Sequence, residues 1–437
     1  MTETAAPTPA LVRQPDFVKL WTAETISQFG TQVSQLAIPL IAANVLQVSP
    51  FEFGLLSTIE FLPFILLSLP AGVSVDRMRR RPILIVGDIG RAIALASIPI
   101  AFVLGVLTIW QLYVVAFITG CLTVFFDVAY QSYLPSLIRR DKLVEGNSKL
   151  EITRSAAQVL GPGIAGFVIG AIGAAVAVVL DSLSFVGSAL FVFLIRRREP
   201  DPGRREDGTS HPPGPGMRAE IRDGLDYVLG NRFLRAIAAC TALSNLAGNL
   251  AGAILILYMT RTIGLDPAAI GLVFSIGSLG FLAGAVVANR VAARLGVGMT
   301  IIAAEALMFP AMLLIAVAPI PYAVPFLTAS WFLQGLSTSV YNINQVSFRQ
   351  AITPERMQGR MNATMRFIVW GTIPVGALLG GFLGGAIGLH ETIWVGTIGA
   401  IVPLVIVLLS PVREVREMPT PVDEAPAAGE PGQPATA

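Results

Sequence analysis

Charge, cysteine and histidine are scarce in this sequence of 437 residues. Asp, Glu, Lys and Arg make up 13% of the chain and apolar residues 54%, so a soluble fold would expose an aggregating surface. Both cysteines, Cys121 and Cys240, lie in apolar stretches, which argues against a disulfide framework. With only His211 and His390, no H-E-x-x-H and no P-loop lysine, the sequence lacks the common metal and nucleotide motifs. We expect no enzymatic activity, cofactor, metal or nucleic-acid partner.

Long uncharged stretches are what the sequence does contain, for example Ala92 to Phe126 and Ala306 to Phe348. About 20 apolar residues span a bilayer, so each stretch predicts one membrane helix or two joined by a turn. Turn and breaker signals divide the chain into twelve predicted spans, at 17–46, 52–75, 82–105, 109–134, 148–170, 174–195, 233–260, 267–290, 299–318, 322–349, 361–385 and 391–411. The lipid bilayer is therefore an expected partner.

Positive charge collects in alternate loops. Arg80, Arg139 and Arg356 lie in loops of one side, whereas Arg261 is the only Lys or Arg in the opposite loops. By the positive-inside rule, we expect both termini and the long connector in the cytoplasm, and the chain in a bacterial-type plasma (inner) membrane. The predicted parts are a cytoplasmic tail (1–16), a six-helix bundle (17–195), a cytoplasmic linker (196–232) with a short amphipathic helix at 218–229, a second six-helix bundle (233–411) and a disordered tail (412–437).

The two halves of the chain resemble each other. At an offset of 215 residues, NSKLEITRSAAQVLGPGIAGFVIGAIG (147–173) lies over NATMRFIVWGTIPVGALLGGFLGGAIG (362–388). This alignment pairs Gly161 with Gly376 and Gly166 with Gly381. Two related halves with a substrate path between them are a known plan of transporters. We therefore predict an all-α integral membrane fold of twelve helices in two pseudo-symmetric bundles.

GVSVDRMRRRP (72–82), in the loop after the second span, resembles the G-x-x-x-D-R-x-G-R-R/K signature of the major facilitator superfamily. In that family this loop helps to hold the cytoplasmic gate, which would assign the role to Gly72, Asp76, Arg77, Arg80 and Arg81. The sequence departs from the pattern where arginine 79 replaces a glycine. The alternative is an ordinary positive-inside loop.

AQVLGPGIAG (157–166) resembles the antiporter motif G-x-x-x-G-P-x-x-G-G of drug exporters in the same superfamily. It keeps Gly161, Pro162 and Gly166 but has Ala157 and Ala165 at two glycine positions. Small residues allow close helix approach and proline adds a kink, so a merely well-packed helix is the alternative. With the flanking segments, the chain is similar to the drug and siderophore exporter branch that holds the bacterial enterobactin and macrolide exporters.

Several charges lie inside predicted spans, where each costs about 2.5–3.5 kcal/mol on translocon scales. Asp88 with Arg91, and Glu151 with Arg154, are three residues apart and can pair along one helix face. We expect structural ion pairs near the cytoplasmic boundary, in a charge network that also includes Arg366.

The remaining carboxylates have no basic neighbour within a helical turn. Burial in a medium of low dielectric favours the protonated carboxyl group, so Asp127 and Glu60, with Glu24 third, are candidates for carrying a proton. The alternative is a partner arginine on a neighbouring helix. We expect Glu24 and Glu305, in the cytoplasmic thirds of their spans, to extend to water.

Polar and aromatic residues inside the spans predict a cavity lining. They are Gln28, Gln32, Asn245, Asn249, Trp331, Gln334, Tyr341 and Trp370. The resemblance implies that spans 1, 4, 7 and 10 line the central path, and all but Trp370, which lies in span 11, fall on them. Amides also bind membrane helices together, so part of this set has a structural alternative.

These observations predict a secondary active transporter: a proton-coupled antiporter that exports a small amphiphilic molecule, such as a drug, macrolide or siderophore, by alternating access. Efflux of this kind would confer multidrug resistance. We expect a monomer with a small-molecule substrate, and a proton or a sodium ion as the coupling ion. Alternatives are a nutrient or metabolite importer of the same fold, and a membrane enzyme or a non-transporting membrane subunit.

Overall fold

The computed structural model describes residues 11–76, 78–139, 142–197, 199 and 217–418. Every regular element in these residues is a helix, which confirms the predicted all-α class. The first six spans are α1 (Pro15–Leu40) continued by η2 (Ile41–Val45), α2 (Pro50–Asp76), α3 (Arg80–Val103), α4 (Ile109–Leu137), α5 (Leu143–Ile172) and α6 (Ala174–Phe193). The next six are α8 (Arg232–Gly252) continued by α9 (Leu255–Tyr258) and η4 (Met259–Ile263), α10 (Pro267–Leu295), α11 (Val297–Ala316), α12 (Ala323–Ala351), α13 (Glu355–Ala386), and α14 (Leu389–Gly399) continued by α15 (Ile401–Leu408).

Short elements complete the described chain. They are η1 (Leu11–Arg13), α7 (Met217–Gly230), η5 (Ile320–Tyr322) and η6 (Pro411–Glu414). Helix α7 lies where the sequence predicts the amphipathic helix of the linker. The linker residues 200–216, with His211, fall outside the described residues, as do residues 1–10 and 419–437 of the predicted tails.

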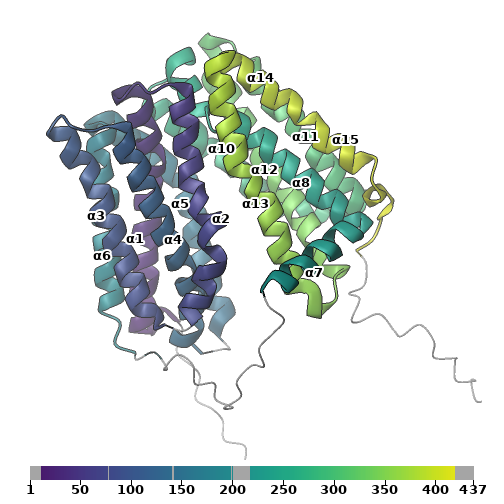
Figure 1. The fold of residues 1–437 in the computed structure, drawn as a ribbon, viewed down its shortest axis with the longest axis horizontal. Coiled ribbons are helices and arrows are strands. Elements are labelled where there is room, and N and C mark those ends of the chain that lie inside the picture. The colour runs from purple at the N-terminus through teal and green to yellow at the C-terminus, as the bar shows by residue number, and fades with distance from the viewer. Residues whose placement is uncertain (1–10, 77, 140–141, 198, 200–216, 419–437) are drawn as a thin grey trace, which may run out of the picture.

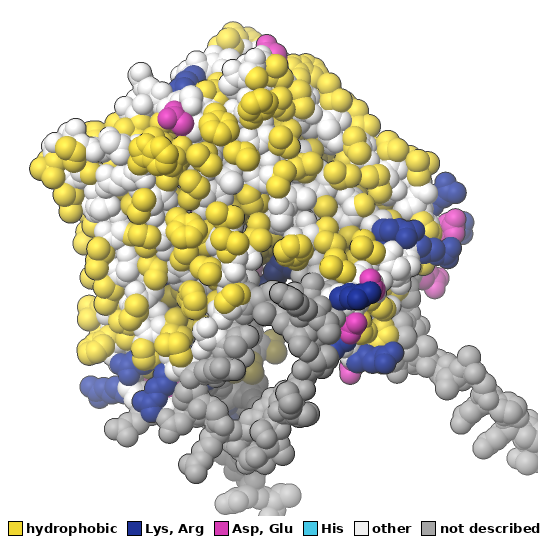
Figure 2. All heavy atoms as spheres, in the orientation of Figure 1, with side chains coloured by type: hydrophobic (Ala, Val, Ile, Leu, Met, Phe, Trp, Pro, Cys, Tyr) yellow, Lys and Arg dark blue, Asp and Glu magenta, His cyan; other side chains and the backbone are white. Residues whose placement is uncertain are grey.

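Ten spans are long and apolar enough by themselves to cross a membrane. The other two, α1 and α12, carry the amides Gln28, Gln32, Gln334 and Asn342. Figure 2 shows apolar side chains over the flanks of both halves, and the Lys and Arg side chains in view concentrated toward the lower end. This surface is typical of a multi-pass membrane protein, and the four amides line cavities inside the molecule.

The helices form two bundles, α1 to α6 and α8 to α15 (Figure 1). The bundles lie close together at the top of the view and diverge toward the bottom, where α7 lies. We call the end that carries η1, α7 and η6 the linker face, and the opposite end the loop face.

The two bundles repeat each other in backbone detail. The first spans of the two halves both end in a π-helical turn at the loop face, η2 and η4. Gly173 and Gly388, paired by the repeat, both adopt positive φ, 83° and 107°, between the fifth and sixth spans of their halves. Only glycine takes such angles without strain. The pseudo-symmetry predicted from the sequence is therefore present in the fold.

The chain after the last span stays packed where the sequence predicts a disordered tail from residue 412. Val412 is fully buried in η6. The backbone N–H of Val297 donates to the carbonyl of Arg416 over 3.1 Å, and that of Gly298 to Val415 over 2.9 Å. These bonds satisfy free N–H groups at the start of α11, so the chain remains attached as far as Arg416.

Candidate functional site

The halves meet along α5 and α10 near the loop face. Gly166 lies against the backbone of α10: a Cβ on Gly166 would lie 2.4 Å from the Pro267 carbonyl oxygen and 2.9 Å from Gly271 Cα. The backbone N–H of Gly163 donates to Ser275 Oγ over 2.7 Å. Only glycine permits this approach, so Gly166 of the antiporter-like motif allows the two halves to come into backbone contact. Gly161 instead packs on α1, where a Cβ would lie 2.4 Å from Gln32 Cγ.

An equivalent contact joins α2 to α13. A Cβ on Gly381, the repeat partner of Gly166, would lie 2.7 Å from the Pro50 carbonyl oxygen and 2.9 Å from Gly54 Cα. The Thr58 hydroxyl donates to the Pro374 carbonyl over 3.2 Å. The two interfaces thus use the same device, glycine against glycine next to a proline carbonyl.

Arg261 adds a third connection at the loop face. From η4 its guanidinium donates to the carbonyl oxygens of Val48 and Ala43 in the other half, each over 2.9 Å. Across the described part of the chain, the hydrogen bonds that join the halves are these two and the bonds of Gly163 and Thr58. All lie toward the loop face, so that end of the molecule is closed.

Two cavities adjoin this closed region. One, of about 560 Å³, lies between the halves and is lined by α1, α5, α9, α10 and α12. The other, of about 370 Å³, lies within the second half among α8, α11 and α12. Gly252, Leu255 and Trp331 line both cavities.

Most of the predicted lining residues lie in these cavities. Gln28 and Gln32 line the larger one, Asn245, Asn249, Gln334 and Tyr341 line the smaller one, and Trp331 lines both. Trp370 lies outside both: its ring contacts Phe64 of α2 edge-on at 6.2 Å between centroids, and the Arg366 guanidinium lies 5.2 Å from its centre.

Glu24 does not extend to water as predicted. It is 6% exposed, and its Oε1 accepts a hydrogen bond from Gln28 Nε2 over 2.7 Å. Arg154, Asp127 and Arg91 act on it electrostatically. The prediction was wrong because residues on neighbouring helices, rather than depth along the helix, decide whether the side chain is covered.

Asp127 and Glu60 are both exposed. Asp127 lies within electrostatic range of Arg91 and Arg154, and of Glu24 across the bundle. Within the part of the chain that the structure describes, neither carboxylate forms an ion pair within 4.0 Å. The structure therefore places Asp127 and Glu24 in one charged group and leaves Glu60 apart from it.

The two pairs expected from three-residue spacing differ in character. Asp88 and Arg91 are buried and 2.5 Å apart, and the guanidinium lies between the rings of Phe126 and Phe185 at 4.3 and 4.1 Å. Cation–π contacts in a desolvated site add about 2 kcal/mol each, so this pair is a packing element of the first bundle. Glu151 and Arg154 lie 4.0 Å apart and are mostly exposed.

Besides its contact with Glu151, Arg154 faces a cavity. Its side chain is 59% exposed and lines the larger cavity. Because its guanidinium lies within electrostatic range of Glu24 and Asp127, Arg154 is the cavity-lining basic member of the charged group in the first half.

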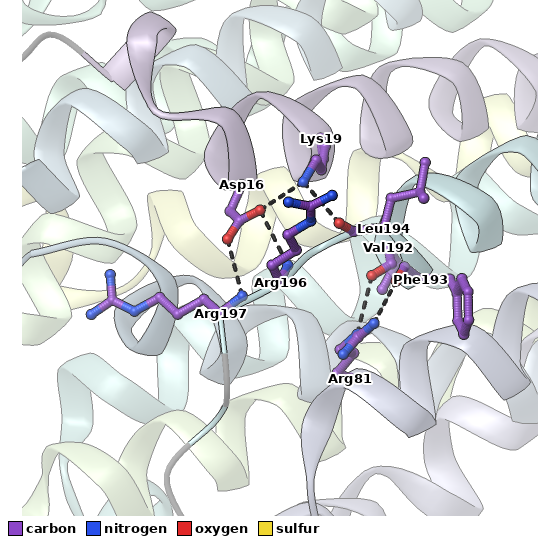
Figure 3. A network of polar contacts seen from close by, with 8 residues as sticks. All are labelled: Asp16, Lys19, Arg81, Val192, Phe193, Leu194, Arg196 and Arg197. Carbon is purple, nitrogen blue, oxygen red and sulfur yellow. Dashed lines mark hydrogen bonds and ion pairs between the residues drawn. The ribbon is translucent and has the colours of Figure 1, made fainter.

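The predicted gating loop contacts its own half. The backbone N–H groups of Arg80 and Arg81 donate to the Glu199 carboxylate over 2.8 and 3.3 Å. The Arg81 side chain donates to the carbonyls of Val192 and Phe193 at the end of α6 (Figure 3). Glu199 thus caps α3, and the loop ties α3 to α6 and to the linker.

The rest of that loop is open or undescribed. A Cβ on Gly72 would meet no heavy atom within 4 Å. Asp76 ends α2, with only its backbone described, and Arg77 lies outside the described residues.

A second contact of the linker face surrounds Asp16. Lys19 Nζ donates to its carboxylate over 2.8 Å, and the backbone N–H groups of Arg196 and Arg197 donate over 3.2 and 3.0 Å (Figure 3). Burial opposes ionisation, but these donors outweigh it and lower the pKa of Asp16 below its usual value. The first span is thereby fastened to the start of the linker.

Glu305 is a cavity residue for which the sequence-based expectation, a side chain extending to water, was wrong. It is 2% exposed, lines the smaller cavity and accepts a hydrogen bond from Ser244 Oγ over 2.8 Å. It does not extend to water. The spacing Glu305, Met308, Met312 and Ile315, one face of α11, is a signal that could have placed it.

Comparison with known proteins agrees with this geometry. A family model described as transmembrane secretion effector, of the major facilitator superfamily, matches residues 5–429. The multidrug efflux pump Tap of Mycolicibacterium fortuitum is 26% identical over 356 residues, covering 79% of this chain and 83% of that protein. Macrolide efflux protein A of Streptococcus pyogenes is 22% identical over 407 residues, covering 92% of this chain and 97% of that protein. An uncharacterised MFS-type transporter of Bacillus subtilis is 28% identical over 189 residues, 43% of this chain and only 44% of that relative's length.

A solved structure shows the same fold. It is that of a bacterial homologue of the iron transporter ferroportin in an inward-facing state, with a TM-score of 0.70 and 18% identity, covering 92% of this chain and 99% of that one. The resemblance drawn from the two motifs is confirmed. The chain therefore belongs to the transmembrane secretion effector family of the major facilitator superfamily and is a multi-pass membrane transporter.

Proposed function

We propose that this transporter is a proton-coupled antiporter that exports a small amphiphilic organic molecule by alternating access. The main support is the cavity of about 560 Å³ between the two halves. In the described residues, the hydrogen bonds that join the halves all lie toward the loop face. A path sealed at one end and lined from both halves can be opened at the other end by rocking the halves.

The charge distribution and the relatives support the proposed direction, export. Basic residues collect on the linker face, so the positive-inside rule places that face, both termini and the linker in the cytoplasm of the bacterial plasma membrane. The closed loop face is then external, and the cavity receives its substrate from the cytoplasm. Two relatives that match most of the chain are named as efflux proteins, for several drugs and for macrolides.

Proton coupling is assigned to the charged group in the first half. Glu24 is buried and Asp127 is exposed, and both lie within electrostatic range of Arg154 in the cavity wall. Rocking the halves changes the wetting of this wall, and a carboxylate that passes between wet and dry surroundings takes up and releases a proton. The ion gradient would drive export in this way, with one chain acting alone.

The test uses the full chain reconstituted in liposomes with a trapped pH dye. An imposed pH gradient should drive accumulation of labelled erythromycin or ethidium, and substrate should in turn move protons. Asp127→Asn should abolish uphill transport and spare exchange of substrate for substrate. Glu414→Gln, which removes an exposed carboxylate of η6 at the linker face, is the matched control.

Two results would count against the proposal. Normal proton-coupled transport in both Asp127→Asn and Glu24→Gln would remove this group from the coupling mechanism. Lack of gradient-driven movement of both substrates by the wild-type chain would reject drug export itself.

A further inference from the structure

The smaller cavity holds a carboxylate that proton coupling in the first half does not use. Glu305 projects from α11 and is 2% exposed, although it lies in the wall of a cavity of about 370 Å³. Its carboxylate accepts a hydrogen bond from Ser244 of α8 over 2.8 Å. The side chain is therefore fixed between two helices at the edge of a space that can hold a small molecule.

Within the described part of the chain, no counter-charge accompanies this carboxylate. Among the described residues that line the smaller cavity, Glu305 is the only one with an ionisable acidic or basic side chain apart from Tyr341, and none is Lys, Arg or His. No described basic residue lies within 4.0 Å of it. Burial without a nearby cation favours the protonated carboxyl group, and a positively charged ligand in the cavity would stabilise the ionised carboxylate instead.

The surface next to the carboxylate is apolar along one line. Met308, Met312 and Ile315 follow Glu305 on the same face of α11 and line the same cavity. At 1.5 Å per residue, Glu305 and Ile315 are about 15 Å apart along the helix. Trp331 forms the wall toward the larger cavity. The cavity thus has an acidic end toward the linker face and an apolar body toward the loop face.

We propose that this cavity is a binding site for an organic monocation with an apolar body, with Glu305 as the anchor of its ammonium group. Methionine side chains adapt to ligands of different shape, so the site would select charge strictly and shape loosely. The amide groups of Asn245, Asn249 and Gln334 line the same cavity and can accept the N–H groups of primary or secondary amines. The inference rests on the proposed function for its cargo, and places cargo and coupling group in different halves.

The hydrogen bond to Ser244 allows a purely structural role to be separated from an anchoring role. Ser244→Ala removes that bond and keeps the charge. Glu305→Asp keeps the charge on a shorter side chain, whereas Glu305→Gln keeps size and hydrogen bonding and removes the charge. An anchor requires the charge, and a helix contact requires the hydrogen bond.

The experiment measures equilibrium binding of labelled benzyltrimethylammonium to the full chain in lipid nanodiscs without any gradient. We expect saturable binding that Glu305→Gln weakens at least tenfold, and that Glu305→Asp, Ser244→Ala and the control Glu414→Gln preserve within threefold. Neutral N,N-dimethylbenzamide should not compete. In benzyl(alkyl)dimethylammonium probes, each buried methylene should tighten binding about fourfold.

Three outcomes would overturn the inference: no saturable binding to the wild-type chain, unchanged binding in Glu305→Gln, or equal competition by the neutral amide. Because no gradient is present, a chain that binds the cation but fails to export it would reject the proposed function and leave this site standing.

Discussion

The glycine contact between α5 and α10 gives the most direct test of the closed loop face. In Gly166→Ala the new Cβ would lie 2.4 Å from the Pro267 carbonyl oxygen, whereas ordinary contact begins at 3.4 Å. The obstructing atom is backbone, so the helices must separate by about 1 Å. Overpacking of this kind costs about 1–3 kcal/mol, and the cost falls only on the state in which the loop face is closed.

The expected result is a shift toward the state open at the loop face. A cost of 1–3 kcal/mol corresponds to a change of about 5- to 150-fold in the ratio of the two states. Gly170→Ala is the matched control on the same helix, because a Cβ there meets no heavy atom within 4 Å. It should leave the ratio unchanged.

The assay follows access to the larger cavity from the loop face. A single cysteine at Gln35, which lines that cavity, is introduced after replacement of Cys121 and Cys240 by serine. An impermeant maleimide added at the loop face should react with it at least fivefold faster in Gly166→Ala than in Gly170→Ala. Equal rates in the two variants would show that the glycine contact does not hold the loop face closed.

The internal repeat supplies an independent copy of this test. In Gly381→Ala the Cβ would lie 2.7 Å from the Pro50 carbonyl oxygen, and Gly385, the repeat partner of Gly170, has no heavy atom within 4 Å of its Cβ. Gly381→Ala should therefore open the loop face, by a smaller factor, and Gly385→Ala should not. An effect in one half alone would contradict the shared device.

Other predictions concern separate contacts. Arg261→Gln removes a cation that donates two hydrogen bonds across the halves, each contributing about 1.5–3 kcal/mol. The variant should therefore speed maleimide labelling of the cysteine at position 35. An unchanged labelling rate would show that the glycine contacts alone keep the loop face closed. Arg91→Met leaves Asp88 buried without its ion-pair partner and should lower the free energy of unfolding by about 3–5 kcal/mol. Denaturation in mixed micelles measures this loss, and adding Asp88→Asn to Arg91→Met should restore part of it. Because the pKa of Asp16 is lowered in the folded chain, its stabilising effect is complete above about pH 4 and is lost as the pH falls through the folded pKa. After correction for intrinsic rates, hydrogen exchange at the Arg196 amide should be constant from pH 7 to 5 and rise only in stronger acid; a rise near pH 6 would contradict this.

The fold could be predicted because membrane insertion imposes a length on every apolar stretch. The predicted fifth span, 148–170, corresponds to α5 (Leu143–Ile172), and the predicted eighth, 267–290, to α10 (Pro267–Leu295). The structure extends both toward the linker face, into charged sequence that hydropathy alone assigns to loops. The helix continues there because its backbone hydrogen bonds do not depend on the apolar surroundings that define a span in the sequence.

The site could be predicted only in part, because side-chain surroundings depend on neighbouring helices. The spacing of Asp88 and Arg91 predicts an ion pair along α3, but the rings that enclose it come from α4 and α6. Glu305 lies at a depth from which a side chain can reach water, yet α8 and α12 cover it. Depth is a property of one helix, whereas burial is a property of the bundle.

The two halves agree in backbone and differ in charge, and this difference bears on mechanism. The glycine contacts at 166 and 381 and the π-helical turns η2 and η4 are shared, so both halves contribute to closing the loop face. By contrast, the first half holds the charged group of Glu24, Asp127 and Arg154, whereas the described lining of the smaller cavity in the second half includes one carboxylate, Glu305, and no basic residue. A symmetric gate with an asymmetric charge distribution allows one half to respond to protons and the other to cargo. The two responses would then be coupled only through the rocking of the halves, so a variant that wedges the loop face open should weaken both together.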